Sequence, residues 1–272
     1  VLYRALEELG IAKFMPRFGH LPYVMGEGNK KLSKRDPESN LLLHREAGMI
    51  PEGLNNYLAL LGWSISPDND VFSMEEMAAA FDISDVNPNP ARFDPKKCIA
   101  INAEHIRLLE PDDFRGRIVP FLHREGLVSA DSYDELTADE QKIMQHASPL
   151  IQTRIQLLGE APGMLGFLFT EDDALELDEK SVSKLKENAP EVLDATIHFI
   201  ENYDGPFTTE ALEHALRELI VEGMDIKPRI AFGPIRVAVT GRQVSPPLFE
   251  SMEILGRESV LNRLHSLRNR LG

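Results

Sequence analysis

A short basic loop near the N-terminus is the clearest sign of chemistry in the chain. Five consecutive residues read Lys31-Leu32-Ser33-Lys34-Arg35, and the stretch before them holds Gly26, Gly28 and Asn29, which favour a turn. A lysine ammonium on a flexible stem suits the concentrated negative charge of a triphosphate. Three basic residues in five positions are also typical of a solvated surface loop. The loop alone leaves both interpretations open.

A second group of chemically suggestive residues lies near the C-terminus. It reads Pro234-Ile235-Arg236-Val237-Ala238-Val239-Thr240-Gly241, followed shortly by Ser245-Pro246-Pro247-Leu248-Phe249. An arginine can hydrogen-bond the edges of unstacked bases, an apolar surface can stack on them, and a proline turn can hold the two together. In the alternative interpretation Leu248 and Phe249 are core residues, and Ser245-Pro246 merely starts a helix.

The distribution of charge keeps nucleic acid among the possible partners. The 272 residues carry a net charge of −15, which on average argues against a polyanionic partner. Residues 13–35, however, hold six basic residues against one acidic residue, and residues 227–272 hold eight against three. Local basic patches are what phosphate contacts require, although such separation of charge can also serve solubility alone.

The surroundings of the basic loop carry a family resemblance. Pro16, Phe18, His20, Leu21 and Pro22 match a P-x-F-x-H-L-P stretch. With Lys31-Leu32-Ser33-Lys34-Arg35 they resemble the second signature of class I aminoacyl-tRNA synthetases, in the form used by bacterial-type glutamyl-tRNA synthetases. The likeness continues through Gly48-Met49-Ile50-Pro51 and the run from Asn56 to Trp63. Ala100 and His105 depart from the family, which commonly has tryptophan and tyrosine there.

The resemblance implies a function and a set of site residues. It implies a glutamate–tRNA ligase, which activates L-glutamate with ATP and Mg²⁺ and transfers it to tRNA(Glu). By family likeness, Lys34 would stabilise the triphosphate, with Lys31, Ser33 and Arg35 around the nucleotide. The same likeness assigns anticodon contacts to Arg236, Ser245, Pro246, Leu248 and Phe249. The family's first, histidine-rich signature does not occur in the chain.

The elements that would position these residues are predicted to be mainly helices. Ser73 and Glu76 predict a capping box, and Asp82 to Arg92 is too turn-rich for regular structure. Residues 234–241 fit either a strand or a helix, and the resemblance favours a helix. The acidic run Glu171-Asp172-Asp173 is interpreted as a solvated loop. Apolar residues recur at helical spacing from Pro111 onward, which predicts a bundle or cage.

The expected organisation is a mainly α protein with three parts. Residues 1–38 would end a catalytic domain, with a short strand or loop remnant and the signature loop. Residues 39–110 would form a helical stem-contact domain and residues 111–272 an all-α anticodon-binding domain. Because Val1 opens in a helix with no initiator methionine, we expect a C-terminal fragment that lacks the catalytic Rossmann fold and is inactive alone.

The remaining composition points to an ordinary intracellular protein. The single cysteine, Cys98, allows no internal disulfide, and no Cys/His spacing suggests a metal site, so a reducing cytoplasm is expected. A monomer is expected as well. No apolar run approaches the roughly 20 residues that cross a bilayer.

A different class of function stays open at this point. The chain could be a non-catalytic helical module that binds tRNA, or an acidic adaptor between proteins. The intact loop favours the ligase, because a pure tRNA binder needs no triphosphate loop. Glutaminyl-tRNA synthetases share the signature, but their anticodon domains are β-barrels, which the helical pattern disfavours.

Overall fold

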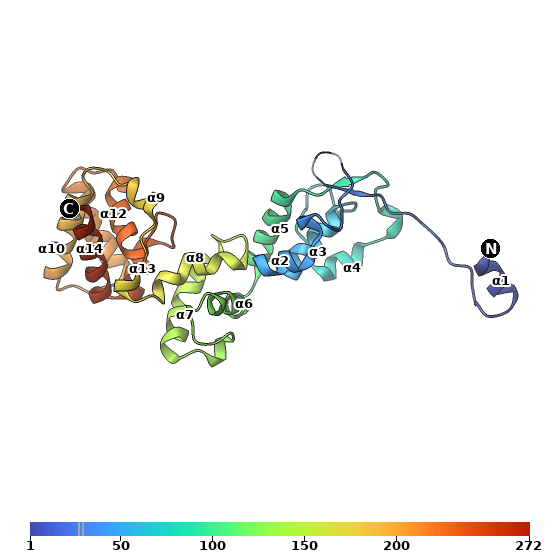
Figure 1. The fold of residues 1–272 in the computed structure, drawn as a ribbon, viewed down its shortest axis with the longest axis horizontal. Coiled ribbons are helices and arrows are strands. Elements are labelled where there is room, and N and C mark those ends of the chain that lie inside the picture. Colours follow the sequence, from blue (N-terminus) through green and yellow to red (C-terminus); the bar gives the residue numbers. More distant parts are fainter. Residues whose placement is uncertain (27, 29) are drawn as a thin grey trace.

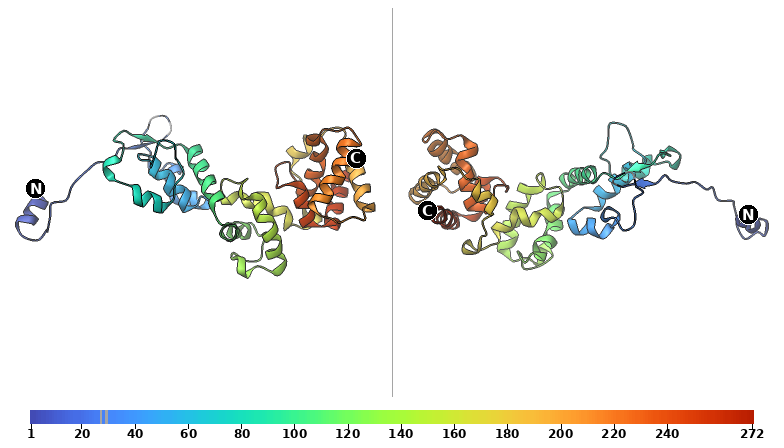
Figure 2. Two further views of the ribbon diagram at one scale, coloured as in Figure 1. Left: turned by 180° about the vertical axis from the view of Figure 1, so that it is seen from behind. Right: turned by 45° about the horizontal axis from the view of Figure 1, so that its top comes forward.

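The chain is mainly α-helical, which confirms the predicted fold class. The computed structural model describes residues 1–26, 28 and 30–272. Asn29, one of the predicted turn residues, lies outside them. Figure 1 shows three groups of helices in a row, with a separate N-terminal helix at one end and the C-terminus in the group at the other. The two further views in Figure 2 show the same elongated arrangement.

The N-terminal segment makes few contacts before it enters the first helical group. Helix α1 (Leu2–Glu8) has no buried residue, and Gly10 follows it with a φ of 69°. Strand β1 (Val24–Met25) pairs in parallel with β2 (Ala91–Arg92). The prediction of irregular structure over residues 82–92 was therefore wrong at Ala91–Arg92, because this pairing is a long-range contact that local turn residues do not encode.

The first helical group packs around its own apolar core. Its helices are α2 (Leu41–Ala47), α3 (Pro51–Leu60), α4 (Met74–Ala80) and α5 (Pro95–Leu108), with the 3-10 turn η2 (Pro37–Ser39) before α2 and η3 (Ile83–Asp85) between α4 and α5. The core residues are Leu54, Tyr57, Phe93, Cys98 and Ile101. Polar caps begin the helices: the predicted capping box of Ser73 and Glu76 is confirmed, and the Asp94 side chain accepts from the first turn of α5.

Two further groups of helices follow, each with a separate core. The second group contains α6 (Pro111–Arg124), η4 (Tyr133–Glu135), α7 (Ala138–Gln152), η5 (Leu158–Glu160), α8 (Ala161–Leu165) and η6 (Gly166–Leu168). A connecting segment carries η7 (Asp172–Ala174) and α9 (Glu179–Ser183). The third group contains α10 (Ala189–Asn202), α11 (Thr209–Leu216), the π-helical η8 (Arg217–Glu222), α12 (Pro228–Thr240), α13 (Leu248–Leu255) and α14 (Arg257–Leu271).

The first and second groups are fastened together by backbone contacts and buried polar groups. The Leu158 N–H donates to the Gly48 carbonyl at 2.9 Å, and a Cβ added to Gly48, whose φ is +93°, would lie 2.3 Å from the Gly159 nitrogen. Asn102 accepts from the Ile50 N–H at 2.8 Å and donates to the Gln156 carbonyl at 2.6 Å. The two groups therefore meet through a close contact that only glycine permits at position 48.

Two kinds of feature are absent from the residues that the structure describes. None of the helices among them is both long and apolar enough to cross a membrane. Within the same residues, no group of three or more His, Cys, Asp or Glu side chains is placed to hold a metal ion.

Candidate functional site

The basic loop follows directly from a tight hairpin at strand β1. The Gly26 N–H donates to the Lys30 carbonyl at 2.8 Å, the Leu32 N–H donates to the Val24 carbonyl at 2.9 Å, and Met25 and Lys31 form an antiparallel bridge. Because the hairpin fixes the backbone on both sides of the bridge, Lys31 has a defined direction. Its Nζ lies 3.9 Å from the centroid of the Tyr23 ring, a cation–π contact.

The second half of the loop is a turn closed by Asp36. The Ser33 N–H donates to Asp36 Oδ2 at 2.7 Å, and the Asp36 N–H donates back to the Ser33 carbonyl at 3.0 Å. Ser33 Oγ accepts from the Arg35 N–H at 3.2 Å, so its hydroxyl supports the turn. Lys34 and Arg35 lie at the tip, exposed, and neither makes an ion pair with another described residue.

A hollow beside this turn brings three of the four sequence-predicted triphosphate residues to one place, and Arg35 is not among the residues that line it. It has a volume of about 460 Å³, and Lys31, Ser33 and Lys34 line it together with Asn40 and Leu41 at the start of α2. Two positive side chains thus flank an open space with no described acidic side chain lining it. Such a space can accept a phosphate group, because the lysines lose no existing ion pair when the phosphate arrives.

The second predicted site is built on helix α12, which confirms the helical interpretation of residues 234–241. The helix begins at Pro228, so Pro234 lies inside it and not at its start as predicted. Gly241 ends it with a φ of 78°, the left-handed conformation that glycine adopts easily. The chain then turns back, and residues 242–247 lead into α13.

Arg236 braces this turn from the side of the helix. Its Nη1 donates to Ser245 Oγ and to the Pro246 carbonyl, each at 2.7 Å. Both bonds use one nitrogen. The other two nitrogens, Nε and Nη2, make no hydrogen bond with the residues that the structure describes. Burial lowers the pKa of Arg236, and the nearby positive charge of Arg154 lowers it further, while Glu250 opposes the shift.

The other predicted residues lie beneath the turn, within the protein. Leu248 and Phe249 are 3% and 8% exposed and belong to the core of the third group. The Phe249 ring meets the Phe232 ring edge to face at a centroid distance of 5.3 Å. In this conformation Leu248 and Phe249 offer no surface for stacking, which supports the core interpretation of these two side chains.

Some residues near Arg236 were missed by reading the sequence. Arg154 comes from the exposed turn after α7, far away in the sequence, and acts on Arg236 through its charge. Arg242 lies on the exposed turn, and its Nη1 is 3.5 Å from where a Cβ on Gly163 of α8 would stand. Val244 on the same turn is 75% exposed. Single residues of these types carry no local signal, so only the packing of the two groups reveals them.

The two candidate sites lie far apart. The basic loop belongs to the first group of helices, and α12 and α13 to the group that holds the C-terminus (Figure 1). Positive side chains that form no ion pair with another described residue therefore occur at both ends of one elongated, acidic molecule.

Comparisons with known proteins match both halves of the chain. Residues 2–99 match the family model of the catalytic domain of class I tRNA synthetases for glutamate and glutamine, and residues 113–268 match that of an anticodon binding domain. A glutamate–tRNA ligase of Kocuria rhizophila is 60% identical over 99% of this chain and 52% of its own length. One from Bifidobacterium adolescentis is 59% identical over the whole chain and 54% of its own length.

A solved structure shows the same fold. A glutamate tRNA ligase from Elizabethkingia meningosepticum, crystallised in complex with its amino acid, superposes with a TM-score of 0.78 at 22% identity. The superposition covers 99% of this chain and 54% of the other. The chain thus spans about half the length of the curated relatives and of the solved structure that it matches.

Proposed function

Because the chain belongs to the glutamate–tRNA ligase family of class I aminoacyl-tRNA synthetases, we propose that it supplies the triphosphate loop and the tRNA-binding helices of such a ligase. The ligase would react L-glutamate with ATP to give glutamyl-adenylate and pyrophosphate, and then pass the glutamyl group to tRNA(Glu) with release of AMP. A cytoplasmic location and a monomeric state remain predictions.

The observation that carries this proposal is the set of positive side chains without acidic partners at the two ends of the fold. Lys34 and Arg35 stand on an exposed turn of fixed backbone, and two nitrogens of Arg236 at the far end make no hydrogen bond with a described residue. A tRNA is itself long, with its acceptor end and its anticodon far apart. The molecule can therefore bind both ends of one tRNA ligand through phosphate and base contacts.

At the basic loop, Lys34 would act by charge alone. As pyrophosphate leaves ATP, negative charge grows on the leaving oxygens, and an ammonium group already in place stabilises that charge without reorganisation. Ser33 and Asp36 would hold the turn, and Arg35 would add a second donor. The turn offers one carboxylate, Asp36, whose Oδ2 accepts the Ser33 N–H. Mg²⁺ takes several oxygen ligands, so it would be held mainly by the phosphates of ATP.

At the other end, Arg236 would read a base of the anticodon. Ser245 and Pro246 fix one side of its guanidinium, which leaves the opposite edge to donate two parallel hydrogen bonds to a base. Leu248 and Phe249 would support the turn from below. Arg154 stands near Arg236 with like charge, and a polyanion would relieve their repulsion.

Binding of tRNA to the 272-residue chain tests the anticodon assignment. We expect Arg236→Ala to reduce the preference for tRNA(Glu) over other tRNAs by about 1 to 3 kcal/mol, the magnitude of one base-edge contact. The matched control is Arg229→Ala, an exposed arginine in the first turn of the same helix, which removes the same charge. Equal effects of the two substitutions on cognate and non-cognate tRNA would disprove the role of Arg236.

A further inference from the structure

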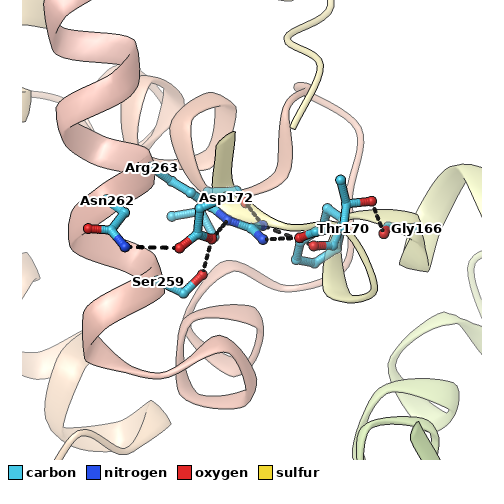
Figure 3. A network of polar contacts seen from close by, with 8 residues as sticks. Gly166, Thr170, Asp172, Ser259, Asn262 and Arg263 are labelled. Carbon is cyan, nitrogen blue, oxygen red and sulfur yellow. Dashed lines mark hydrogen bonds and ion pairs between the residues drawn. The ribbon is translucent and has the colours of Figure 1, made fainter. Parts of the chain in front are cut away.

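A buried arginine lies where the second and third groups of helices meet. Arg263 on α14 is 2% exposed. Its Nη1 donates to the carbonyls of Phe167 and Val239, each at 3.0 Å, and its Nη2 donates to the Thr170 carbonyl at 2.8 Å. One guanidinium thus ties η6 and the segment after it to helix α12. Figure 3 shows Arg263 beside Asp172 and Thr170.

An acidic side chain completes this arrangement. Arg263 Nε donates to Asp172 Oδ1 at 2.6 Å, and Asp172 also accepts from Ser259 Oγ and, at 3.1 Å, from Asn262 Nδ2. Burial raises the pKa of Asp172, but the hydrogen bonds from Ser259, Arg263 and Asn262 together bring it below its usual range. The interpretation of residues 171–173 as a solvated loop was therefore wrong for Asp172, whose partners come from more than 80 residues away in the sequence.

The contacts of Arg263 are directed at backbone from two different helical groups. Phe167 belongs to the core of the second group, whereas Val239 belongs to the core of the third. Val239 also follows Arg236 by one turn of α12. The position of the Arg236 turn relative to the second group, which carries Arg154, therefore depends on Arg263.

Packing alone gives no reason for an ion pair at this junction. Ile254 and Leu255 of α13 already bring apolar surface against the core of the second group. A buried ion pair commonly adds little stability over an apolar replacement, whereas its directional hydrogen bonds fix one geometry. The charged pair of Arg263 and Asp172 is best explained by a need to hold the second and third groups in one defined orientation.

We propose that Arg263 and Asp172 are a positioning pair that sets the orientation of the third helical group to the second, so that Arg236 and Arg154 face one RNA ligand together. This proposal rests on the proposed function, because it assigns the orientation to the binding of a tRNA anticodon loop. Neither residue of the pair contacts the RNA.

A measurement without RNA tests the positioning itself. Spin labels on Glu125→Cys in the second group and Glu191→Cys in the third, both at exposed positions, report the distance between the groups, while Cys98 is buried and leaves the labels specific. We expect one narrow distance distribution in the otherwise unchanged chain and a broad one with Asp172→Asn. The matched control is Asp194→Asn, because Asp194 pairs with Arg268 of the same helix α14 inside one group. Equal widths for both variants would overturn the proposal.

Binding of tRNA(Glu) to the 272-residue chain tests the purpose of the orientation. We expect Asp172→Asn to weaken binding about tenfold and Asp194→Asn less than about twofold, the usual range of coupling between sites being about 2- to 100-fold. In chains that already carry Arg236→Ala, Asp172→Asn should weaken binding by less than about threefold. The reason is that the contact of Arg236 with the RNA, which the Arg263–Asp172 pair positions, is already lost. If Asp172→Asn reduced the affinity for tRNA(Glu) equally in the presence and absence of Arg236, the pair would have a merely structural role. The proposal that it positions Arg236 for RNA would then be overturned.

Two further variants keep the test decisive. Arg263→Lys keeps the charge but cannot reach three backbone carbonyls at once, and it should behave as Asp172→Asn does. If Asp172→Asn proves too unstable to study, Ser259→Ala combined with Asn262→Ala weakens the hold on Asp172 without removing a charge. Failure of the proposed function would appear separately, as a preference for tRNA(Glu) that Arg236→Ala leaves unchanged while the label distances still respond to Asp172→Asn.

Discussion

Lys31 and Lys34 lie three residues apart in one loop, yet their ammonium groups face different surroundings. Lys31 rests on the Tyr23 ring, whereas Lys34 stands at the tip of the Ser33–Asp36 turn and pairs with no other described side chain. A cation–π contact is worth about 0.5–1 kcal/mol at an exposed site, so Lys31 can leave the ring for a phosphate at small cost. Lys34 needs no such release.

This difference leads to a prediction for the chemical step. In a glutamate–tRNA ligase that contains this chain, Lys34→Ala should slow pyrophosphate exchange by about 3 kcal/mol in activation free energy, the effect of losing one charged donor from a preorganised site. Lys30→Ala removes the same charge from the adjacent hairpin and should leave exchange within about threefold of the starting rate. A rate that Lys34→Ala leaves unimpaired would contradict the role given to the loop.

At the scale of single residues, local runs could be predicted from the sequence and long-range neighbours could not. The basic loop and its turn residues are contiguous, so their shared location follows from the order of residues alone. Arg154 and Asp172 acquire their partners only when helices distant in the sequence pack together. Leu248 and Phe249 show the same limit, because an apolar side chain beside a turn can face solvent or core, and only the fold decides.

Helices α3 and α5 pack against each other across a buried polar pair. His105 Nε2 lies 2.7 Å from Asn56 Oδ1, an acceptor that also receives the Phe72 N–H, so the ring must donate from Nε2. His105 is 6% exposed. Burial lowers the pKa of His105, and the charge of Glu52 only partly opposes the shift.

The direction of this shift predicts how stability depends on pH. Because the folded state binds a proton on His105 less readily than the unfolded state, the free energy of unfolding should fall as the pH drops below about 6.5, and continue to fall until the folded pKa is reached. Chemical denaturation at pH 7.5 and 5.5 measures the fall.

Substitution of His105 measures how much this residue contributes to the pH dependence of stability. His105→Gln should flatten this part of the pH profile and reduce stability at pH 7.5 by about 1 to 3 kcal/mol, because it disturbs a buried hydrogen bond. His20→Gln, at an exposed position of the N-terminal segment, controls for the loss of a histidine. The assignment fails if the two variants give the same pH profile.

Among the elements, helix ends were the most predictable features. Ser73 and Glu76 form a cap within four residues, so their sequence specifies their contact. Helix α12 shows the opposite case: Pro234 suggested a start, but the helix begins a turn and a half earlier at Pro228, which also suits an opening position. Strand β2 had no local signal at all, since it forms by pairing with β1, which lies more than 60 residues earlier in the sequence.

The whole molecule is acidic, with basic residues gathered toward its two ends, so its binding of tRNA should depend strongly on salt. Affinity should fall between about 50 and 200 mM KCl, with a slope of roughly −0.7 to −0.9 in log affinity against log salt for each neutralised phosphate. Arg242→Ala should reduce the slope by about 1 if Arg242 meets a phosphate. Arg217→Ala, whose guanidinium already pairs with Glu213, should leave the slope unchanged. An affinity that ignores salt would refute binding through the basic ends.

The close contact at Gly48 limits how modular this protein can be. Ile50 lies in the core of the second helical group, although it is far from that group in the sequence, and the Gly48 carbonyl accepts from Leu158. Suppose that recombination replaced everything after residue 110 with the segment of a distant relative. Gly48 and Ile50 would then have to pack against a second group whose surface had not evolved to fit them. Viable exchange would have to carry the segment around Gly48 and Ile50 along, so evolution is expected to reshuffle these two groups as one inherited block.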